Sequence, residues 1–416
     1  MHFDRCIGLA VPVFFWLTRE SILIKKIFLA SAFGIAVVAA IAGQQAQAES
    51  LPRYRAVYAF DQVKGSGPTS ELLKSKWTGK LLLGTTQTGG AHNLGTLFLF
   101  DPDTRKTLVV HSFNQDGIDG FYPSGLTDAN HGAVLGVTNF GGAFYNGTIY
   151  KVSVDGKYQV LHSFEGAPFD GMYPESAPVA QANGTFVGTT SFGGVDNAGT
   201  IYRLAADGKV TLMHSFSGPD GKIPQFGLAV GPDGLLYGTT NTGGENDSGT
   251  IYKVLPNGSV QTVYAFDPST SGVYPRKLVL GRDGDFYGVA SGGGSGSGGT
   301  AFRVTKDGAL TVLHNFAPGS AEGDYPNGLT LGTDGLLYGT TGNFGSDQLG
   351  SVFQMTTSGA VKVLHKFGSS SNSGQCDWKQ PLGAPTEVSN GDFFGTTSAG
   401  GVCGSPGYGT IYKLDK

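Results

Sequence analysis

Aspartate and tyrosine recur along this chain in the pattern Asp-Gly-x-Tyr-Pro. A carboxylate repeated at a fixed spacing can bind Ca²⁺ or sugar hydroxyls, and a tyrosine offers a flat apolar face with a polar tip. A purely structural role is the alternative, in which aspartate caps a turn, glycine takes a positive φ and proline begins a strand. One copy replaces tyrosine with Ile223, and another replaces aspartate with Ser271. The candidate ligand-binding residues are Asp119, Tyr122, Asp170, Tyr173, Asp220, Tyr274, Asp324 and Tyr325.

Histidines recur two residues before a repeated phenylalanine, and Tyr58 and Tyr264 take that position in two other copies. Tyrosine keeps an aromatic body with a polar tip but would abolish metal binding or proton transfer, so the position predicts packing. The histidines are His111, His162, His214, His314 and His365. His92 lies outside the pattern and remains a candidate catalytic base.

Acidic residues that occur in only one copy are the better candidates for catalysis, because a catalytic group is needed once. If the protein is an enzyme, its acids or metal ligands would be Asp196, Glu245, Asp247 and Asp347, together with His92. The sequence contains no GxSxG, HExxH or CxxC motif, which removes the local signatures of serine hydrolases, zinc proteases and redox centres.

These residues sit in a repeat that occurs seven times. The Gly-Thr-Thr step recurs from Gly84 to Gly395 at spacings of 50 to 56 residues. The copy that starts at Phe226 predicts four short strands: A over 227–231, B over 235–240, C over 249–254 and D over 259–266. Asp-Gly and Asn-Gly links between strands favour two-residue hairpins with positive φ at both central residues. Each copy is therefore predicted to be a four-stranded antiparallel meander.

Seven four-stranded units predict an all-β fold, a seven-bladed β-propeller. Residues 54–60 resemble a strand D without its own A, B and C, whereas residues 409–414 resemble a strand C without its D. We expect the N-terminal strand to complete the last blade and close the ring. A β-solenoid is the alternative, but the sequence has no capping repeats.

The recurring strings GTTxxGGxxxxGTIYKV and VLHSFxxxDGxYP resemble the bacterial GloVer tandem-repeat family, a group of exported repeat proteins. The resemblance covers nearly all of residues 54–416. It implies the same repeat fold and no particular activity. Some members carry a C-terminal anchoring segment, which this sequence does not match.

The last copy departs furthest from the repeat. Cys376 and Cys403 lie in two of its loops, and an even pair of cysteines in an exported chain predicts a disulfide, with two free thiols as the alternative. Trp378 is either a cover for the closing blade or an exposed aromatic platform for a sugar.

The N-terminal segment predicts export. Lys25 and Lys26 precede an apolar run over 27–42 and the string Ala46-Gln47-Ala48, which indicates a signal peptide with an N-terminal extension over residues 1–48. A retained membrane anchor is the alternative, but the run is shorter than a spanning helix needs. The propeller domain would then be 49–416, periplasmic or secreted, with no membrane span after cleavage.

Charge and repetition limit the function classes. Residues 1–48 hold four of the 28 basic and two of the 32 acidic residues, which leaves a net charge of −6 and argues against nucleic acid as a partner. We favour a monomeric, non-catalytic module that binds carbohydrate or protein through the B–C and D–A loops, with Ca²⁺ as a possible cofactor. The alternative is a polysaccharide lyase or hydrolase with its site at the channel mouth.

Overall fold

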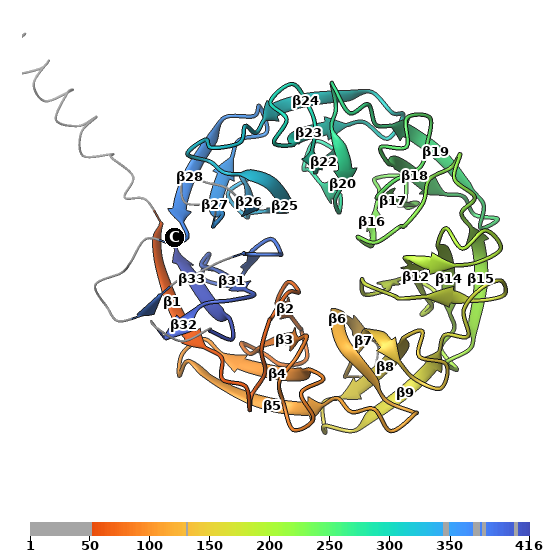
Figure 1. Cartoon of the computed structure of the whole chain (residues 1–416), viewed down its shortest axis with the longest axis vertical. Coiled ribbons are helices and arrows are strands. Elements are labelled where there is room, and N and C mark those ends of the chain that lie inside the picture. Colours follow the sequence, from red (N-terminus) through yellow and green to blue (C-terminus); the bar gives the residue numbers. More distant parts are fainter. Residues whose placement is uncertain (1–51, 130–131, 344–348, 369–374, 377–379, 403–406) are drawn as a thin grey trace, which may run out of the picture. The chain divides into compact units, whose positions relative to one another are not determined.

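A computed structural model of the chain describes residues 52–129, 132–343, 349–368, 375–376, 380–402 and 407–416. In these ranges the strands form seven antiparallel blades around a central channel (Figure 1). The predicted seven-bladed propeller is therefore confirmed. The described residues contain no helix long and apolar enough to cross a membrane.

Each blade places strand A at the channel and strand D at the rim (Figure 1). The first blade is β2 (Leu73–Lys74), β3 (Leu82–Thr86), β4 (Thr96–Asp101) and β5 (Lys106–Ser112). The second is β6 (Gly120–Ala129), β7 (Ala133–Gly141), β8 (Thr148–Ser153) and β9 (Tyr158–Ser163). The third is β11 (Val179–Ala180), β12 (Phe186–Thr190), β14 (Thr200–Leu204) and β15 (Val210–Ser215). The fourth is β16 (Leu228–Val230), β17 (Leu236–Thr240), β18 (Thr250–Val254) and β19 (Val260–Ala265).

In the fifth blade strand A is interrupted, and both of its parts pair with strand B. This blade is β20 (Val273–Pro275), β21 (Val279–Leu280), β22 (Phe286–Gly292), β23 (Thr300–Val304) and β24 (Leu310–Asn315). The sixth is β25 (Asp324–Leu331), β26 (Leu337–Asn343), β27 (Ser351–Met355) and β28 (Val361–Lys366). The seventh is β30 (Thr386–Glu387), β31 (Phe393–Thr397), β33 (Thr410–Asp415) and β1 (Arg53–Ala59). Two short ribbons pair β10 (Gly171–Met172) with β13 (Phe192–Gly193) and β29 (Gln375–Cys376) with β32 (Gly401–Val402).

The hydrophobic core is divided among the blade interfaces. Between the third and fourth blades, for example, Val187 and Ile201 pack with Leu236 and Tyr252. A comparable cluster of described residues fills each of the other six interfaces. Each blade therefore depends on both neighbours to bury its apolar faces.

The N-terminal strand closes the ring as predicted. β1 pairs antiparallel with β33 from Arg53 opposite Asp415 to Ala59 opposite Thr410. The guanidinium of Arg55 lies 2.6 Å from the carboxylate of Asp415. Figure 1 shows β1 beside β33 at the rim of the last blade.

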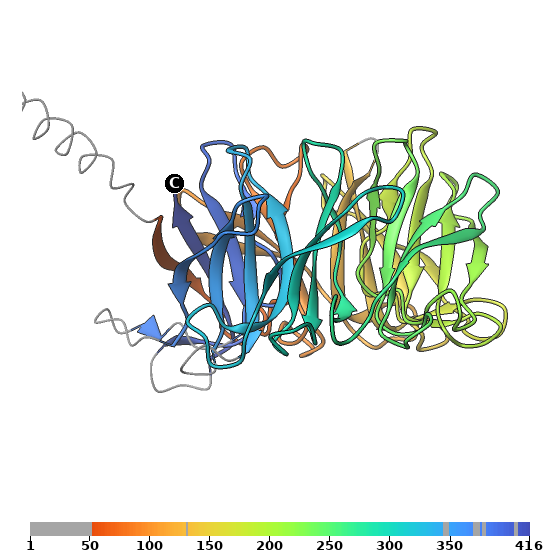
Figure 2. The same ribbon diagram turned by 90° about the horizontal axis from the view of Figure 1, so that it is seen from above.

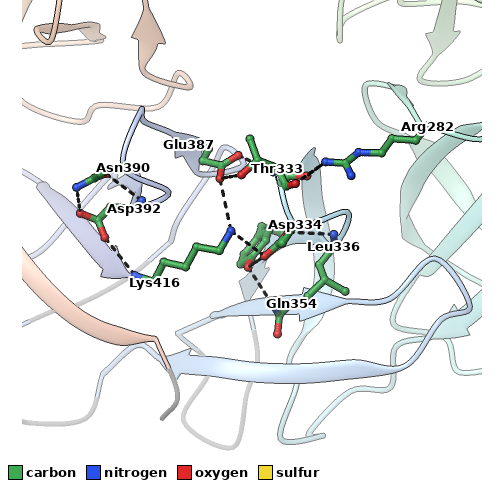
Figure 3. A network of polar contacts seen from close by, with 11 residues as sticks. Arg282, Thr333, Asp334, Leu336, Gln354, Glu387, Asn390, Asp392 and Lys416 are labelled. Atoms are coloured by element: carbon green, nitrogen blue, oxygen red, sulfur yellow. Dashed lines mark hydrogen bonds and ion pairs between the residues drawn. The ribbon is translucent and has the colours of Figure 1, made fainter. Parts of the chain in front are cut away.

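A polar network reinforces the closing blades (Figure 3). The ammonium of Lys416 lies 3.3 Å from Asp334 Oδ2 and 3.9 Å from Glu387 Oε1. Glu387 also accepts hydrogen bonds from the backbone N–H and the hydroxyl of Thr333, at 2.7 and 2.6 Å. Arg282 donates to the carbonyl oxygen of Thr333, so this network joins the fifth, sixth and seventh blades.

The loops fall on two faces because neighbouring strands are antiparallel (Figure 2). We call the face with the A–B and C–D links the turn face, and the face with the B–C and D–A loops the loop face. The expectation of two-residue hairpins is wrong at Asp233-Gly234. Gly231 N donates to Leu235 O, and of this pair only Gly234 has a positive φ, 78°, which marks a longer turn with a glycine bulge.

Candidate functional site

The Asp-Gly-x-Tyr-Pro motif lies in D–A loops on the loop face, and its aspartate pairs with the recurring histidine. Nε2 of His162 lies 2.9 Å from Oδ2 of Asp170, and the corresponding distance from His214 to Asp220 is 2.6 Å. Asp170 also accepts the backbone N–H groups of Glu165 and Gly171. The aspartate thus joins strand D of one blade to the loop that starts the next.

Desolvation and hydrogen bonding shift the pKa of Asp220 in opposite directions. Burial raises the pKa of its carboxyl group, but the hydrogen bonds from His214 and from the backbone N–H of Ser217 outweigh burial. The net result is a pKa below the ordinary value of 3.8. Asp220 is therefore held as a carboxylate in the folded protein.

Histidine and acid are lost together within the chain. The copy with Tyr264 in the histidine position has Ser271 in place of the aspartate, and the copy with Tyr58 has Lys64 there. The histidine rings also pack as predicted: His111 stacks on Tyr158 with centroids 3.7 Å apart. The sequence analysis found the packing but missed the pairing, although this correlated loss was a visible signal for it.

In the sixth blade the assignment of Asp324 to the first motif position needs correction. His314 pairs with Glu322, 2.7 Å away, so Glu322 takes the position that Asp119 has in the second blade. Asp324 instead occupies the third position of the motif. Its side chain is only 1% exposed and its Oδ1 has no hydrogen-bond partner among the described residues. Burial raises the pKa of Asp324 to about 6.

In the copies with a motif tyrosine, the glycine has a positive φ at Gly272 and Gly323 but not at Gly120 or Gly171, whereas the tyrosine takes the left-handed conformation in all four. Its φ is 54° at Tyr122, 57° at Tyr173, 60° at Tyr274 and 53° at Tyr325. The backbone N–H of this residue donates to the B–C loop of the preceding blade, as from Tyr173 to Asn146 O at 2.9 Å. The glycine serves close approach: a Cβ at Gly120 would lie 1.8 Å from Oγ1 of Thr138.

The described unique acids of the B–C loops lie on exposed turns, Asp196 in the third blade and Glu245 with Asp247 in the fourth. Asp196, Glu245 and His92 are exposed, and Asp247 is 73% exposed. Asp247 Oδ1 accepts the N–H of Gly243 at 2.9 Å, and Asn197 makes the same bond in the preceding blade. This contact gives Asp247 a role in shaping its turn.

Three predicted sites fall wholly or partly outside the described residues. They are Asp347, Trp378 and the Cys376–Cys403 disulfide, of which Cys403 is not described. Cys376 lies on β29, which pairs with β32 immediately before residue 403. The disulfide stays a prediction.

The central channel holds a set of polar groups that the sequence analysis missed. The residue after the motif proline differs in every blade: Thr69, Ser124, Glu175, Gln225, Arg276, Asn327 and Leu382. All of these except Arg276 line a cavity of about 440 Å³ at the centre of the ring. This proline lies in strand A or at most five residues before it, so the residues surround the loop-face mouth of the channel. The signal was one variable position inside an otherwise repeated motif.

Glu175 and Gln225 form the polar wall between the third and fourth blades. Gln225 donates through Nε2 to Oε2 of Glu175, and Ser191 Oγ donates to Oε1 at 2.9 Å. Burial raises the pKa of Glu175, and these two hydrogen bonds offset part of the shift. On the wall of the second blade, Ser124 Oγ lies 2.8 Å from Oδ1 of Asn139.

Two cations of the fifth blade, Arg276 and Lys277, lie beside the channel. The guanidinium carbon of Arg276 lies 4.4 Å from the ring centroid of Phe226, and burial lowers the pKa of Arg276 to about 10. Nζ of Lys277 lies 3.0 Å from Oε2 of Glu71, which belongs to the first blade. The charge of Glu71 raises the pKa of Lys277. The pair connects two non-adjacent blades at the channel.

The described residues contain no group of three or more His, Cys, Asp or Glu side chains placed to hold a metal ion. The motif aspartates are spread around the ring, each beside its own histidine where one is present. The arrangement at the channel mouth instead offers planar amide and carboxylate groups, which suit hydrogen bonding to a polar organic ligand.

Comparisons with known proteins identify the repeat. Among solved structures, the extracellular domain of a protein assigned as a hybrid two-component system from B. thetaiotaomicron has a TM-score of 0.57 and 11% identity, over 86% of this chain and 39% of that one. This chain thus spans about two-fifths of that protein's length. Oligogalacturonate lyase from Vibrio parahaemolyticus has a TM-score of 0.54 and 14% identity, over 88% of this chain and 94% of the other. At these identities the likeness shows the fold alone.

No curated protein matches the sequence. The model of the Gloeobacter/Verrucomicrobia repeat matches residues 47–194 and 174–377. The chain therefore belongs to the Gloeobacter/Verrucomicrobia repeat family.

Proposed function

We propose that this propeller is an extracytoplasmic binding module that holds a carbohydrate at the loop-face mouth of its channel. One observation carries the proposal: the residue after the motif proline differs in every blade, and at this position five different polar side chains and one leucine line a single cavity. A cavity of about 440 Å³ falls within the range of small-ligand sites.

The chemistry of the mouth favours sugars among polar ligands. Glu175 and Gln225 present planar groups that can bind neighbouring hydroxyls, and Ser124 and Asn327 add shorter donors and acceptors on other blades. Positive and negative side chains are balanced around the mouth, since Glu71 pairs with Lys277 and the charge of Glu175 acts on Arg276 just outside the lining. A neutral, hydroxyl-rich ligand fits such a lining better than a highly charged one.

Export rests on the N-terminal sequence, where Lys25 and Lys26 precede an apolar run and an Ala-x-Ala string. A cell-envelope or extracellular location would expose the domain to polysaccharides. Mass spectrometry of the protein recovered from the culture medium or periplasm should find an N-terminus at Glu49.

Catalysis is the second candidate, and the raised pKa of Glu175 favours it. A partly buried carboxyl group with a raised pKa suits a general acid that protonates a leaving group. Against this, both carboxylate oxygens of Glu175 already accept hydrogen bonds, from Gln225 and Ser191. We therefore rank binding above lyase or hydrolase chemistry.

The chain from residue 49 onward should be incubated with a panel of polysaccharides, with and without Ca²⁺, and both retention and released product should be measured. Retention without product supports the binding module. Product release would replace it with the enzyme, and loss of that release in Glu175→Gln would identify the acid.

A further inference from the structure

An uninterrupted row of aromatic rings lies on the loop face of the second and third blades. Phe121 and Phe140 are stacked, with centroids 5.7 Å apart and planes inclined by 21°. The ring centroids of Phe140 and Tyr173 are 4.9 Å apart, and those of Tyr173 and Phe192 are 5.9 Å apart. All four side chains are half-buried, so the rings support one another and still present surface to solvent. We call these four residues the aromatic row.

The fold does not require the row. The positions that Phe140 and Phe192 occupy hold Thr88, Thr242, Gly292 and Ala399 in other described blades. The position of Tyr173 holds Gly67 in the first blade, Ile223 in the fourth and Gln380 in the seventh, all with a positive φ, so the fold needs no aromatic ring there.

The row is continuous with the proposed binding site. Asn139 precedes Phe140 in the chain, and Ser191 precedes Phe192. Asn139 lines the cavity, and Ser191 donates to the carboxylate of Glu175. Tyr173 is separated from Glu175 by Pro174 alone. The row therefore begins within two residues, along the chain, of groups that line the channel mouth.

We propose that the aromatic row is a platform for an extended, unbranched β-linked glucan that leaves the channel mouth across the second and third blades. This inference rests on the proposed function and specifies its ligand. Sugars with equatorial hydroxyls have apolar C–H faces that stack on aromatic rings, while their edges carry the hydroxyls that Asn139 and Glu175 can bind. A protein partner would need a broader buried patch than four rings provide.

The test is the length dependence of binding, measured by calorimetry with β-1,4- and β-1,3-linked glucose oligomers of two to six units. The channel mouth holds one end, so the disaccharide should bind, and the hexasaccharide should bind roughly ten-fold more tightly through the row. Phe140→Ala should remove most of this gain and leave the affinity for the disaccharide unchanged. Phe140→Leu should also remove most of the gain, because leucine keeps the apolar volume of the side chain but lacks the flat face of the ring.

Phe169→Ala is the matched control, since Phe169 is 84% exposed on the neighbouring loop and outside the aromatic row. Its affinity for every oligomer should equal that of the unmodified protein. Equal affinity for short and long oligomers, or a gain that survives both Phe140 variants, would overturn the platform while leaving the channel site intact. Failure of every oligomer to bind would overturn the channel site for glucans and the platform with it.

Discussion

Nε2 of His111 lies 2.8 Å from Oδ2 of Asp119, so a rim strand of the first blade anchors the loop that enters the second. The other oxygen of Asp119 accepts hydrogen bonds from the hydroxyl of Tyr158 and from the N–H of Gly120. This one contact joins two sequence motifs, the recurring histidine and the Asp-Gly-x-Tyr-Pro loop. It explains why both recur without a role for either in catalysis.

The pairing predicts a specific result for the third blade. Asp170→Ala removes the acceptor for His162 and for two backbone N–H groups, so the free energy of unfolding should fall by about 1–3 kcal/mol in urea titrations. The double variant His162→Tyr with Asp170→Ser copies the fifth blade and should recover part of that loss. If the loss of unfolding free energy in the double variant equals the sum of the losses in His162→Tyr and Asp170→Ser, the two residues are not coupled.

A buried hydroxyl in strand C should be dispensable. The hydroxyl of Tyr252 has no hydrogen-bond partner among the described residues, and its side chain is fully buried. The first, fifth and sixth blades hold Phe98, Phe302 and Phe353 at this position. Since an unpaired buried hydroxyl costs roughly 1–3 kcal/mol, Tyr252→Phe should raise the midpoint of thermal unfolding. A lower midpoint would mean that the hydroxyl has a partner, such as a buried water.

Asp324 should make stability depend on pH. Its pKa is raised from 3.8 to about 6 by burial, so between these values the folded protein holds a proton that the unfolded chain has lost. The contribution to stability is fully present below pH 4 and is lost as the pH rises through 6. Asp324→Asn should therefore gain up to about 3 kcal/mol relative to the unmodified protein between pH 4 and 7. Equal pH profiles for the two proteins in urea titrations would show that Asp324 is ionised in the fold.

The sequence was sufficient for the architecture, because seven copies of one pattern define the strands, the faces and the strand that closes the ring. The sequence was less informative where one copy carries its acidic residue one or two positions away from the place it has in the others. Asp324 was aligned with the motif aspartates because it precedes Tyr325, and only the contact of His314 identifies Glu322 as the equivalent residue.

The channel site escaped prediction for a different reason. Glu175 and Gln225 stand at a position that differs in every copy, so recurrence along the sequence does not mark them. The contact of Lys277 with Glu71 joins residues 206 positions apart, and only the closed ring brings them together. The described acids that occur in one copy only, such as Glu245, lie on exposed turns.

The most direct test of the account is the affinity of Gln225→Ala for a β-linked glucose disaccharide, measured by calorimetry beside Gln159→Ala. Gln225 lines the channel, whereas Gln159 is exposed on the rim strand β9. With the channel mouth as the site, Gln225→Ala should bind roughly ten-fold or more weakly, and Gln159→Ala should match the unmodified protein. A folded Gln225→Ala variant with unchanged affinity would contradict the channel site.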